Sequence, residues 1–492
     1  MAVLLIESAP VVSRERPGAR LANVGCAAGG EAERETTEPT MKQKRLIMQL
    51  FRTIVTVCVV GAMAVMIFSL KDELARTRAK AAALRTPSAP PHVFSMSCKV
   101  TSCGGELATP DGRARAIAWF RTNHVTKLWL ESYRHGERVE TPILTAERDA
   151  FRAAGFDVCG MITPTRLNDP DGGGEAPIVT CWSDKIAQSR LAAESARAAK
   201  IFDTIIIDDF LFSSCGDSCA RCKAEKDRRG IRDWGFFRRE LLKQVALASI
   251  INAGQKSNPN VHFIIKYPCW YENWAQRGYD PIVGTRLFGE SWIGTETRDA
   301  NPNPVQGCML MDAMDRLTDG KCGGGWYDAL DCTPEKFVEQ ARYTILGGAR
   351  ESLVHCYDYL IAADPGKTPF GEKADRSHAC AAAFSREVDG LARLAELLRG
   401  AERTGWEWQT DGELKHTGVS QHRFRKGGRR YLVCMNTTDA PRTSEIADGR
   451  RIRKILALPD DAAGRVASGD SDRSTLELAP HGLLMVEAET DF

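Results

Sequence analysis

The segment FDTIIIDDFLF, residues 202–212, constrains the fold of this chain more than any other. A continuous isoleucine run suits a strand that is buried on both faces, which is typical of a parallel sheet covered by helices. The run stops at two adjacent carboxylates, Asp208 and Asp209. A buried charge is costly unless it is paired, bound or in a wet cleft, and such strands present functional groups at their carboxyl ends. The segment therefore predicts a functional site or, as the alternative, an aspartate that caps the next helix.

The chain repeats one theme from about residue 92 to residue 360: a short apolar strand, a polar or aromatic tip, then an amphipathic helical stretch. Helices are expected at residues 147–155, 183–200, 232–254, 333–349 and 385–400, with Gly155 and Gly254 as C-caps. The eight expected strands are HVFSMS (92–97), VTKLWLESYR (125–134), FDVCGMITP (156–164), FDTIIIDDF (202–210), VHFIIKYPCWY (261–271), SWIGTETRD (291–299), KCGGGWYD (321–328) and ESLVHCYDYL (351–360). Eight alternating units predict an α/β fold, a (β/α)8 TIM barrel at residues 91–400.

The last part of the chain has a different pattern. Residues 401–492 alternate apolar and polar side chains in period two, and Gly427 and Gly428 form a hairpin-turn pair. This pattern predicts a small C-terminal antiparallel β-sandwich domain.

An uncharged stretch of 18 residues, TIVTVCVVGAMAVMIFSL at 53–70, is just long enough to span a bilayer as a helix. We expect a disordered tail at residues 1–45, a transmembrane or signal helix at 46–70, and a linker at 71–90. Basic residues flank the apolar run on both sides, so its orientation and its cleavage stay open. The expected location is membrane-anchored or secreted, with the catalytic domain outside the cytoplasm.

The overall charge is nearly balanced, with 66 basic and 64 acidic residues and a formal net charge of +2. This balance argues against a nucleic-acid partner, which would favour a basic stripe. We expect no cofactor and no metal in the catalytic site.

Three cysteines, Cys215, Cys219 and Cys222, follow directly after the aspartate strand. Their C-x3-C-x2-C spacing fits either a zinc knuckle without its fourth ligand or a loop pinned by a disulfide. Because neither a histidine nor another cysteine lies at normal finger spacing, the pinned loop is the favoured interpretation.

In a barrel, the strand tips converge on one face, so residues that end the eight strands should be neighbours. The tips are rich in carboxylates, which bind sugar hydroxyls, and in aromatic rings, on which sugars stack. The candidate carbohydrate-binding residues are Glu131, Tyr133, Asp209, Lys266, Tyr267, Trp270, Arg298, Asp299, Trp326, Tyr327, Asp328, His355 and Tyr357. The expected partner is an oligosaccharide or polysaccharide substrate.

Glycosidic cleavage needs two carboxyl groups across the scissile bond. Asp208 and Glu296 are the candidate pair, because the tips of the fourth and sixth strands lie on one side of a barrel mouth. Lys266, on the strand between them, would keep a neighbouring carboxylate ionised. As alternatives, Glu296 forms a salt bridge with Arg298 or Arg286, and Lys266 snorkels at the barrel end.

The spacing D-T-I-I-I-D, from Asp203 to Asp208, resembles the fourth-strand motif of retaining α-galactosidases and α-glucosidases. That resemblance implies a catalytic barrel with a C-terminal β-sandwich, Asp208 as the nucleophile and Asp209 as an accessory hydroxyl ligand. It also implies an acid/base aspartate after the sixth strand, where this chain has Glu296, with Asp299 as another candidate.

Four further segments, KYPCWY, GTETRD, CGGGWYD and ILGGARES, resemble uncharacterised glycosidase-like barrel proteins of exported bacterial sets. Both resemblances cover roughly residues 92–400. Chitinase-like barrels share a D-x4-D strand, but their acid two residues later is Phe210 here, which disfavours that family.

The leading hypothesis is a glycoside hydrolase. The first alternative is a catalytically inactive barrel that binds carbohydrate. The second is a metal-dependent hydrolase that uses Asp208, Asp209 and His355 as ligands.

Overall fold

The computed structural model describes residues 89–168, 179–213, 215, 217–269, 274–296, 304–362, 374–410, 416–447, 452–456, 464–469 and 473–488. All of these lie within residues 81–492, the second of two compact units. The predicted tail, the predicted membrane or signal helix and most of the predicted linker lie outside the described residues. Within the described ranges, every helix is too short or too polar to cross a membrane.

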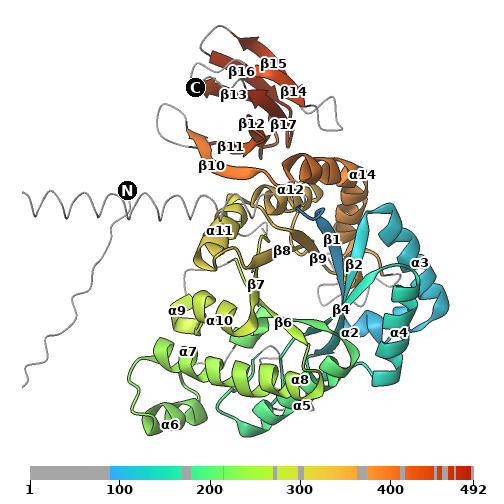
Figure 1. Ribbon diagram of the computed structural model, residues 1–492, viewed down its shortest axis with the longest axis vertical. Coiled ribbons are helices and arrows are strands. Elements are labelled where there is room, and N and C mark those ends of the chain that lie inside the picture. The colour runs from blue at the N-terminus through green and yellow to red at the C-terminus, as the bar shows by residue number, and fades with distance from the viewer. Residues whose placement is uncertain are drawn as a thin grey trace, which may run out of the picture. The chain divides into compact units, whose positions relative to one another are not determined.

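Eight parallel strands form a closed ring (Figure 1). The strands run in the order β1-β9-β8-β7-β6-β5-β4-β2, and pairing of β1 with β2 closes the ring. Their bounds are β1 Val93–Cys98, β2 Val125–Arg134, β4 Asp157–Ile162, β5 Thr204–Ile207, β6 His262–Tyr267, β7 Glu290–Gly294, β8 Cys322–Asp328 and β9 Glu351–His355. A short antiparallel strand, β3 Glu137–Arg138, extends β2. The predicted barrel is therefore confirmed, strand by strand.

Helices surround this ring (Figure 1). The five predicted helical segments correspond to α4, α5, the continuous α7, η3 and α8, then α12 and α14. The helices are α2 Val100–Cys103, η1 Glu106–Ala108, α3 Pro110–Thr122, α4 Thr141–Ala153, α5 Lys185–Ile201, η2 Asp209–Phe212, α6 Ala220–Arg228, α7 Trp234–Val245, η3 Ala246–Ile251, α8 Asn252–Ser257, α9 Trp274–Arg277, α10 Pro281–Phe288, α11 Pro304–Leu317, α12 Pro334–Leu346, α13 Tyr357–Leu360 and α14 Ala374–Leu398.

The two predicted glycine C-caps have different outcomes. Gly155 follows α4 with φ +95°, a backbone conformation that suits glycine at a helix end. Gly254 lies inside α8, and a Cβ there would come 2.4 Å from the ring of Phe263 on β6. The prediction for Gly254 was wrong, because this glycine allows close packing between helix and strand rather than ending the helix.

Two separate apolar clusters follow from the alternation of the strands. One fills the ring and takes its side chains from alternate strand positions: Trp129, Cys159, Met161, Ile206, Ile264, Trp292, Trp326 and Leu353. The other, much larger, lies between the strands and the helices. The residues of the first cluster mark the face of each strand that points into the barrel, and the polar residues that follow them on the same face also point inward.

The C-terminal part consists of antiparallel sheet, as predicted. One sheet has the order β10-β11-β12-β17-β14 and the other β13-β16-β15. The bounds are β10 Glu402–Thr410, β11 His416–Lys426, β12 Arg429–Asn436, β13 Arg442–Ala447, β14 Ile452–Leu456, β15 Gly464–Gly469, β16 Arg473–Leu478 and β17 Leu483–Ala488. Gly427 and Gly428, both with positive φ, form the hairpin turn between β11 and β12. An apolar cluster takes side chains from both sheets: Leu432 and Cys434 of β12 from the first sheet, and Leu476 and Leu478 of β16 from the second.

Polar contacts connect this β region to the barrel helices. Arg403 pairs with Asp312 of α11 at 2.6 Å. His481 lies between Glu339 of α12 and Asp439, with each ring nitrogen 2.8 Å from a carboxylate oxygen. The two regions therefore share charged contacts as well as packing.

Candidate active site at the carboxyl end of the barrel

Polar side chains extend the inner faces of the strands toward their carboxyl ends. Glu131 lies two residues after Trp129, Asp208 two after Ile206, and Lys266 two after Ile264. His355 lies two residues after Leu353 in the same way. Because side chains two apart on a strand share a face, these four groups continue the interior column of the barrel. The sequence-predicted convergence of Glu131, Asp208, Lys266 and His355 thus has a basis in strand register.

Asp208 is the centre of this group. It follows β5 directly and also caps η2, since its Oδ1 accepts a hydrogen bond from the Phe210 backbone amide at 3.3 Å. Its Oδ2 accepts a hydrogen bond from Lys266 Nζ at 3.0 Å, and an Arg134 guanidinium nitrogen lies 3.9 Å from the same oxygen. The capping interpretation of this aspartate is therefore confirmed, and its functional interpretation stays a prediction.

Two cations keep Asp208 ionised. Burial by itself would raise the pKa of Asp208, but the positive charges of Lys266 and Arg134 outweigh burial and hold that pKa well below its usual range. Only 1% of the Asp208 surface is exposed, and Lys266 is equally buried. A buried carboxylate of this kind is stable as an anion because its partners are buried with it.

A bulge in β2 places Arg134 on the inner face. The register between β2 and β4 shifts between Glu131 and Tyr133, so Tyr133 turns to the outer cluster. Arg134 can then donate to both Glu131 carboxylate oxygens, at 2.8 and 2.9 Å. Glu131 also accepts hydrogen bonds from the Thr163 hydroxyl and, at 3.2 Å, from the Val100 backbone amide. Glu131 therefore holds Arg134 in place, and both of its carboxylate oxygens accept hydrogen bonds.

Asp209 and Glu296 complete a set of three neighbouring carboxyl groups. Burial, followed by the negative charge of Asp208, raises the pKa of Asp209 well above its usual range, and the charge of Glu296 adds to this effect. Glu296 follows β7 and is buried, and its Oε1 accepts a hydrogen bond from the Cys269 thiol at 3.7 Å. The site thus holds Asp208 as a carboxylate and, beside it, the Asp209 carboxyl group, which retains its proton.

Lys266 is also held by an aromatic ring. Its Nζ lies 3.8 Å from the centroid of Trp326, which is a cation–π contact. Trp326 is itself positioned by a hydrogen bond from its Nε1 to the backbone oxygen of Tyr267, at 3.2 Å. The Lys266 side chain therefore covers one face of the Trp326 ring, so that face is not available for stacking with a sugar.

His355 ends β9 opposite Ser97 of β1, and its Nδ1 lies 2.8 Å from the Ser97 hydroxyl. Burial, and then the positive charge of Lys266, lowers the pKa of His355 well below its usual value. The imidazole is consequently neutral at physiological pH. Asp328, the last residue of β8, pairs with His355 in the strand register and accepts a hydrogen bond from the Leu330 amide at 3.0 Å.

Four predicted tyrosines are not brought to this group. Tyr133, Tyr267 and Tyr327 point outward into the cluster between strands and helices, and Tyr357 of α13 packs in the same cluster. Tyr267 and Tyr327 each follow an inward-facing residue, Lys266 or Trp326, so alternation turns them to the opposite side. Three other predicted residues, Trp270, Arg298 and Asp299, lie outside the described residues.

Sequence reasoning missed two polar contributors, Thr163 and Ser97. Thr163 lies two residues after the interior residue Met161. Ser97 pairs with His355 across β1 and β9. A search for polar residues at the inward parity of each strand would have found both, although small hydroxyl side chains give no signal of their own.

A divalent metal at Asp208, Asp209 and His355 fits this site poorly, because Lys266 and Arg134 already supply positive charge to Asp208. In the described part of the chain, the one group of at least three clustered metal-ligand side chains is elsewhere and consists of four cysteines. The metal-dependent alternative therefore has no geometric support among these three residues.

The barrel with carboxyl groups at its carboxyl end defines a protein of the glycosidase-like TIM-barrel class. A family model described as "Probable glycosyl hydrolase, catalytic domain" matches residues 81–386. The chain belongs to this glycosyl hydrolase family, as the match covers more than half of its length.

A curated relative from Saccharolobus solfataricus, described as an uncharacterised protein, is 24% identical over 236 residues. This alignment covers 44% of the chain and 39% of the relative's length, so the chain matches well under half of that protein.

Among solved structures, a variant of the trehalulose synthase MutB aligns with 81% of the chain and 99% of its own length, at 9% identity and a TM-score of 0.47. The isomaltulose synthase of Klebsiella sp. LX3 aligns with 81% of the chain and 99% of its own length, at 8% identity and a TM-score of 0.45. A family 30 xylanase of Clostridium acetobutylicum aligns with 82% of the chain and 98% of its own length, at 10% identity and a TM-score of 0.41. At these values the likeness does not bear on substrate or mechanism.

Proposed function

We propose that this protein hydrolyses O-glycosidic bonds with Asp208 and Glu296 as the carboxyl pair. The observation that carries the proposal is the buried group at the carboxyl end of the barrel, in which Asp208 is kept ionised by Lys266 beside two further carboxyl groups. Retaining and inverting glycosidases both need one carboxylate and one carboxylic acid across the scissile bond. The family membership fits the same chemistry.

In this proposal Asp208 is the group that attacks the anomeric carbon or activates a water molecule. Its negative charge at neutral pH is what either role requires. The resemblance of Asp203–Asp208 to the α-galactosidase and α-glucosidase motif favours the nucleophile. Glu296, from the sixth barrel strand, is the acid of this proposal: it takes up a proton before the reaction and passes it to the leaving oxygen.

Asp209 acts as a neutral hydrogen-bond donor rather than as an anion. A hydrogen bond from Asp209 helps to lower the pKa of Asp208, and the raised pKa of Asp209 keeps the donated proton in place. The second oxygen of Asp209 can accept a hydrogen bond from a sugar hydroxyl. Neutral His355, at the opposite side of the barrel, is suited to bond a hydroxyl group as donor or acceptor.

The substrate class is an oligosaccharide or polysaccharide, and the test is activity on such substrates. The full-length protein is screened against chromogenic glycosides and a panel of polysaccharides, and the variants Asp208→Asn and Glu296→Gln are compared with it. We expect both to lose at least about 10²-fold in kcat/KM, the usual contribution of a single acid or base group.

Matched controls come from the opposite ends of the same strands. Asp203→Asn changes an exposed aspartate at the amino end of β5, and Glu290→Gln changes the first residue of β7. Both are expected to retain activity within a few-fold. Activity that survives Asp208→Asn and Glu296→Gln to the same degree as these controls would falsify the assignment.

A catalytically inactive carbohydrate-binding barrel is the second candidate. The observation that favours it is the depth of Asp208, which is 1% exposed and already bonded to Lys266. Binding on a glycan array without turnover of any bound glycan would support this candidate. Turnover that is lost in Asp208→Asn would eliminate it.

For the cellular location, we propose that the catalytic region is exported or anchored outside the cytoplasm. The support is the uncharged 18-residue run at 53–70. Fractionation followed by carbonate extraction and by protease treatment of intact cells tests this. Recovery of the protein in the soluble cytosol would refute the proposal.

A further inference from the structure

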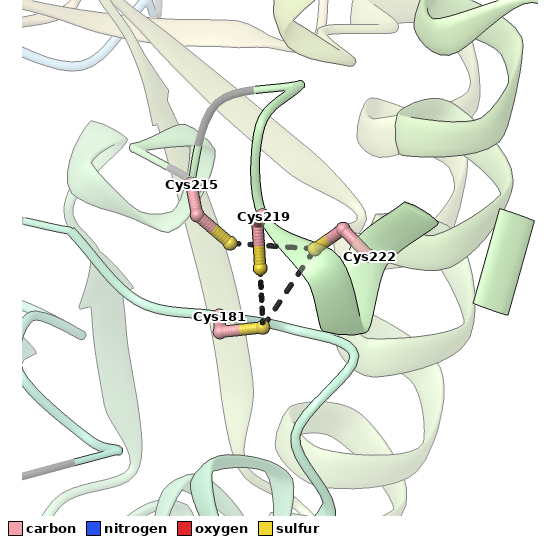
Figure 2. Close-up of side chains that lie close together, drawn as sticks. All are labelled: Cys181, Cys215, Cys219 and Cys222. Atoms are coloured by element: carbon pink, nitrogen blue, oxygen red, sulfur yellow. Dashed lines mark hydrogen bonds between the residues drawn. The ribbon is translucent and has the colours of Figure 1, made fainter. Parts of the chain in front are cut away.

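Four cysteines from separate parts of the chain meet beside the loop that follows β5 (Figure 2). Cys215 and Cys219 lie in that loop, and Cys222 lies in the first turn of α6. The fourth, Cys181, lies between β4 and α5, well upstream of the other three. From the sequence, the three clustered cysteines fitted a zinc knuckle without its fourth ligand or a disulfide-pinned loop, and Cys181 was missed, because this partner comes from the preceding βα loop.

The sulfur atoms of the four cysteines lie close enough together to share one metal ion. Cys181 Sγ lies 3.8 Å from Cys219 Sγ and 3.7 Å from Cys222 Sγ, and Cys215 Sγ lies 3.3 Å from Cys222 Sγ. All four ligand atoms are within 4.8 Å of one another. A zinc ion with Zn–S bonds of about 2.3 Å in tetrahedral geometry separates its sulfur ligands by about 3.8 Å.

Other occupants fit this spacing less well. A disulfide joins sulfurs in pairs at about 2.0 Å, whereas Cys181 is almost equally distant from two partners. An iron–sulfur cluster places several iron and sulfide atoms between its cysteines, which calls for a wider arrangement than the observed one. All four cysteines have free thiols in the structure.

The surroundings are those of a closed site. Cys181 and Cys222 are buried, and Cys215 and Cys219 are partly buried. The Ser183 hydroxyl donates to Cys222 Sγ at 3.4 Å, in the manner of the outer hydrogen bonds that orient metal ligands. No other acidic or histidine side chain among the described residues joins the four cysteines in this group. Four thiolates without an open position are typical of a structural zinc site rather than a catalytic one.

We propose that Cys181, Cys215, Cys219 and Cys222 bind one zinc ion. The ion ties the loop after β5 to the segment that precedes α5. Protein contacts already connect these two segments, since Trp182 Nε1 donates to the Leu211 backbone oxygen at 2.8 Å and the Thr180 amide donates to the Ser213 oxygen at 3.1 Å. The bound ion would hold the chain just beyond Asp208 in place, and this inference does not depend on the proposed reaction.

The test is the metal content of the full-length protein, purified under reducing conditions without chelator and measured by inductively coupled plasma mass spectrometry. We expect about one equivalent of zinc per chain. The variants Cys181→Ala and Cys222→Ala are expected to lose the metal. Cys434→Ala, which changes a buried cysteine in the C-terminal sheets, is the matched control and should keep it.

A second measurement covers variants that fail to fold. Cobalt(II) added to the metal-free wild-type protein should give the intense visible absorption of a tetrahedral thiolate site, and zinc should bleach it. Absence of stoichiometric metal in the reduced protein, together with failure of added cobalt(II) to give the thiolate absorption, would overturn the proposal. Retention of zinc in both Cys181→Ala and Cys222→Ala would also overturn it.

Discussion

Replacement of Lys266 by methionine removes one charge from the centre of the barrel while keeping most of the side-chain volume. Lys266 is 1% exposed, donates to Asp208 at 3.0 Å and covers the Trp326 ring at 3.8 Å. In Lys266→Met, Asp208 keeps a single cation, the Arg134 guanidinium at 3.9 Å, which is also shared with Glu131. The variant therefore tests whether Lys266 keeps Asp208 ionised.

The size of the effect follows from the distance between the charges. At 3.0 Å and an effective dielectric constant of about 20, the Lys266–Asp208 attraction is about 5.5 kcal/mol, of which Arg134 can replace only part. Since one pH unit corresponds to about 1.4 kcal/mol, we expect the acidic limb of the kcat/KM profile to move up by at least about one pH unit. The free energy of unfolding at pH 7 should fall by about 3 to 5 kcal/mol, the usual cost of removing one partner from a buried pair.

The pH dependence of stability has a defined sign. The folded-state pKa of Asp208 lies below its unfolded value of about 3.9, so its contribution is complete above that pH and is lost as the pH falls through the folded-state pKa. In Lys266→Met the folded-state pKa of Asp208 rises, so the contribution of Asp208 to stability is smaller and is lost at a higher pH than in the wild type. The difference in unfolding free energy between wild type and variant should therefore be full at pH 7 and shrink as the pH falls below about 3.9.

Lys127 offers a matched control at the other end of the barrel. It pairs with Glu351 at 2.9 Å and lies 4.4 Å from the Trp129 ring centroid, the same two types of contact. Lys127→Met should also destabilise the fold in urea unfolding, but it should leave the pH dependence of activity unchanged. If Lys266→Met keeps the wild-type pH profile and unfolds with a loss below about 1 kcal/mol, the reasoning on this ion pair is refuted.

Three further predictions follow from single groups. Asp209→Asn preserves a neutral hydrogen-bond donor, so it should lower kcat/KM less than about 10-fold, and Asp209→Ala should lower it more. A loss of about 10²-fold or more in Asp209→Asn would instead show that Asp209 transfers its proton in the reaction. Gly160→Ala would place a Cβ 2.5 Å from the Phe202 ring, so urea unfolding should show a loss of about 1 to 3 kcal/mol, and an unchanged midpoint would contradict that packing. The hydrogen bond with Glu339 raises the pKa of His481 to about 9, so protonated His481 stabilises the fold fully below about pH 6.5. The free energy of unfolding should therefore fall by about 1 to 3 kcal/mol as the pH rises through 9, and urea unfolding of His481→Asn should lack this pH dependence.

The fold could be predicted from the sequence because each barrel strand is a short apolar run with its own tip. All eight predicted runs contain a strand. Helices that begin with turn-like residues were harder to recognise, and α3 is the clearest example. Its first residues, Pro110, Asp111 and Gly112, are typical of turns, yet Pro110 starts the helix and Thr109 caps it by accepting from the Gly112 amide at 3.1 Å. Gly112 is also in close contact with Glu106, where a side chain would not fit.

The inward-facing residues of the candidate site could be predicted only where strand parity was regular. Asp208 and Lys266 could be assigned because both continue an inward-facing column. Tyr133 and Arg134 exchange faces at the β2 bulge, and a bulge has no signature in one sequence. The partnership of Cys181 with the later cysteines was equally hidden, because it depends on two loops that only the closed barrel brings together.

The position and the charge of Asp208 are controlled by different parts of the molecule. Inside the barrel, Lys266 and Arg134 set its ionisation, and Glu131 holds Arg134 by two hydrogen bonds. Outside the barrel, the loop after β5 is fastened by Trp182 and, in the proposed zinc site, by the four cysteines. Changes of the first kind act on the protonation state, so they should shift the pH at which activity appears. Loss of the metal acts on the position of the loop, so it should lower kcat while leaving that pH in place, because the cations that neutralise Asp208 stand on strands the loop does not move.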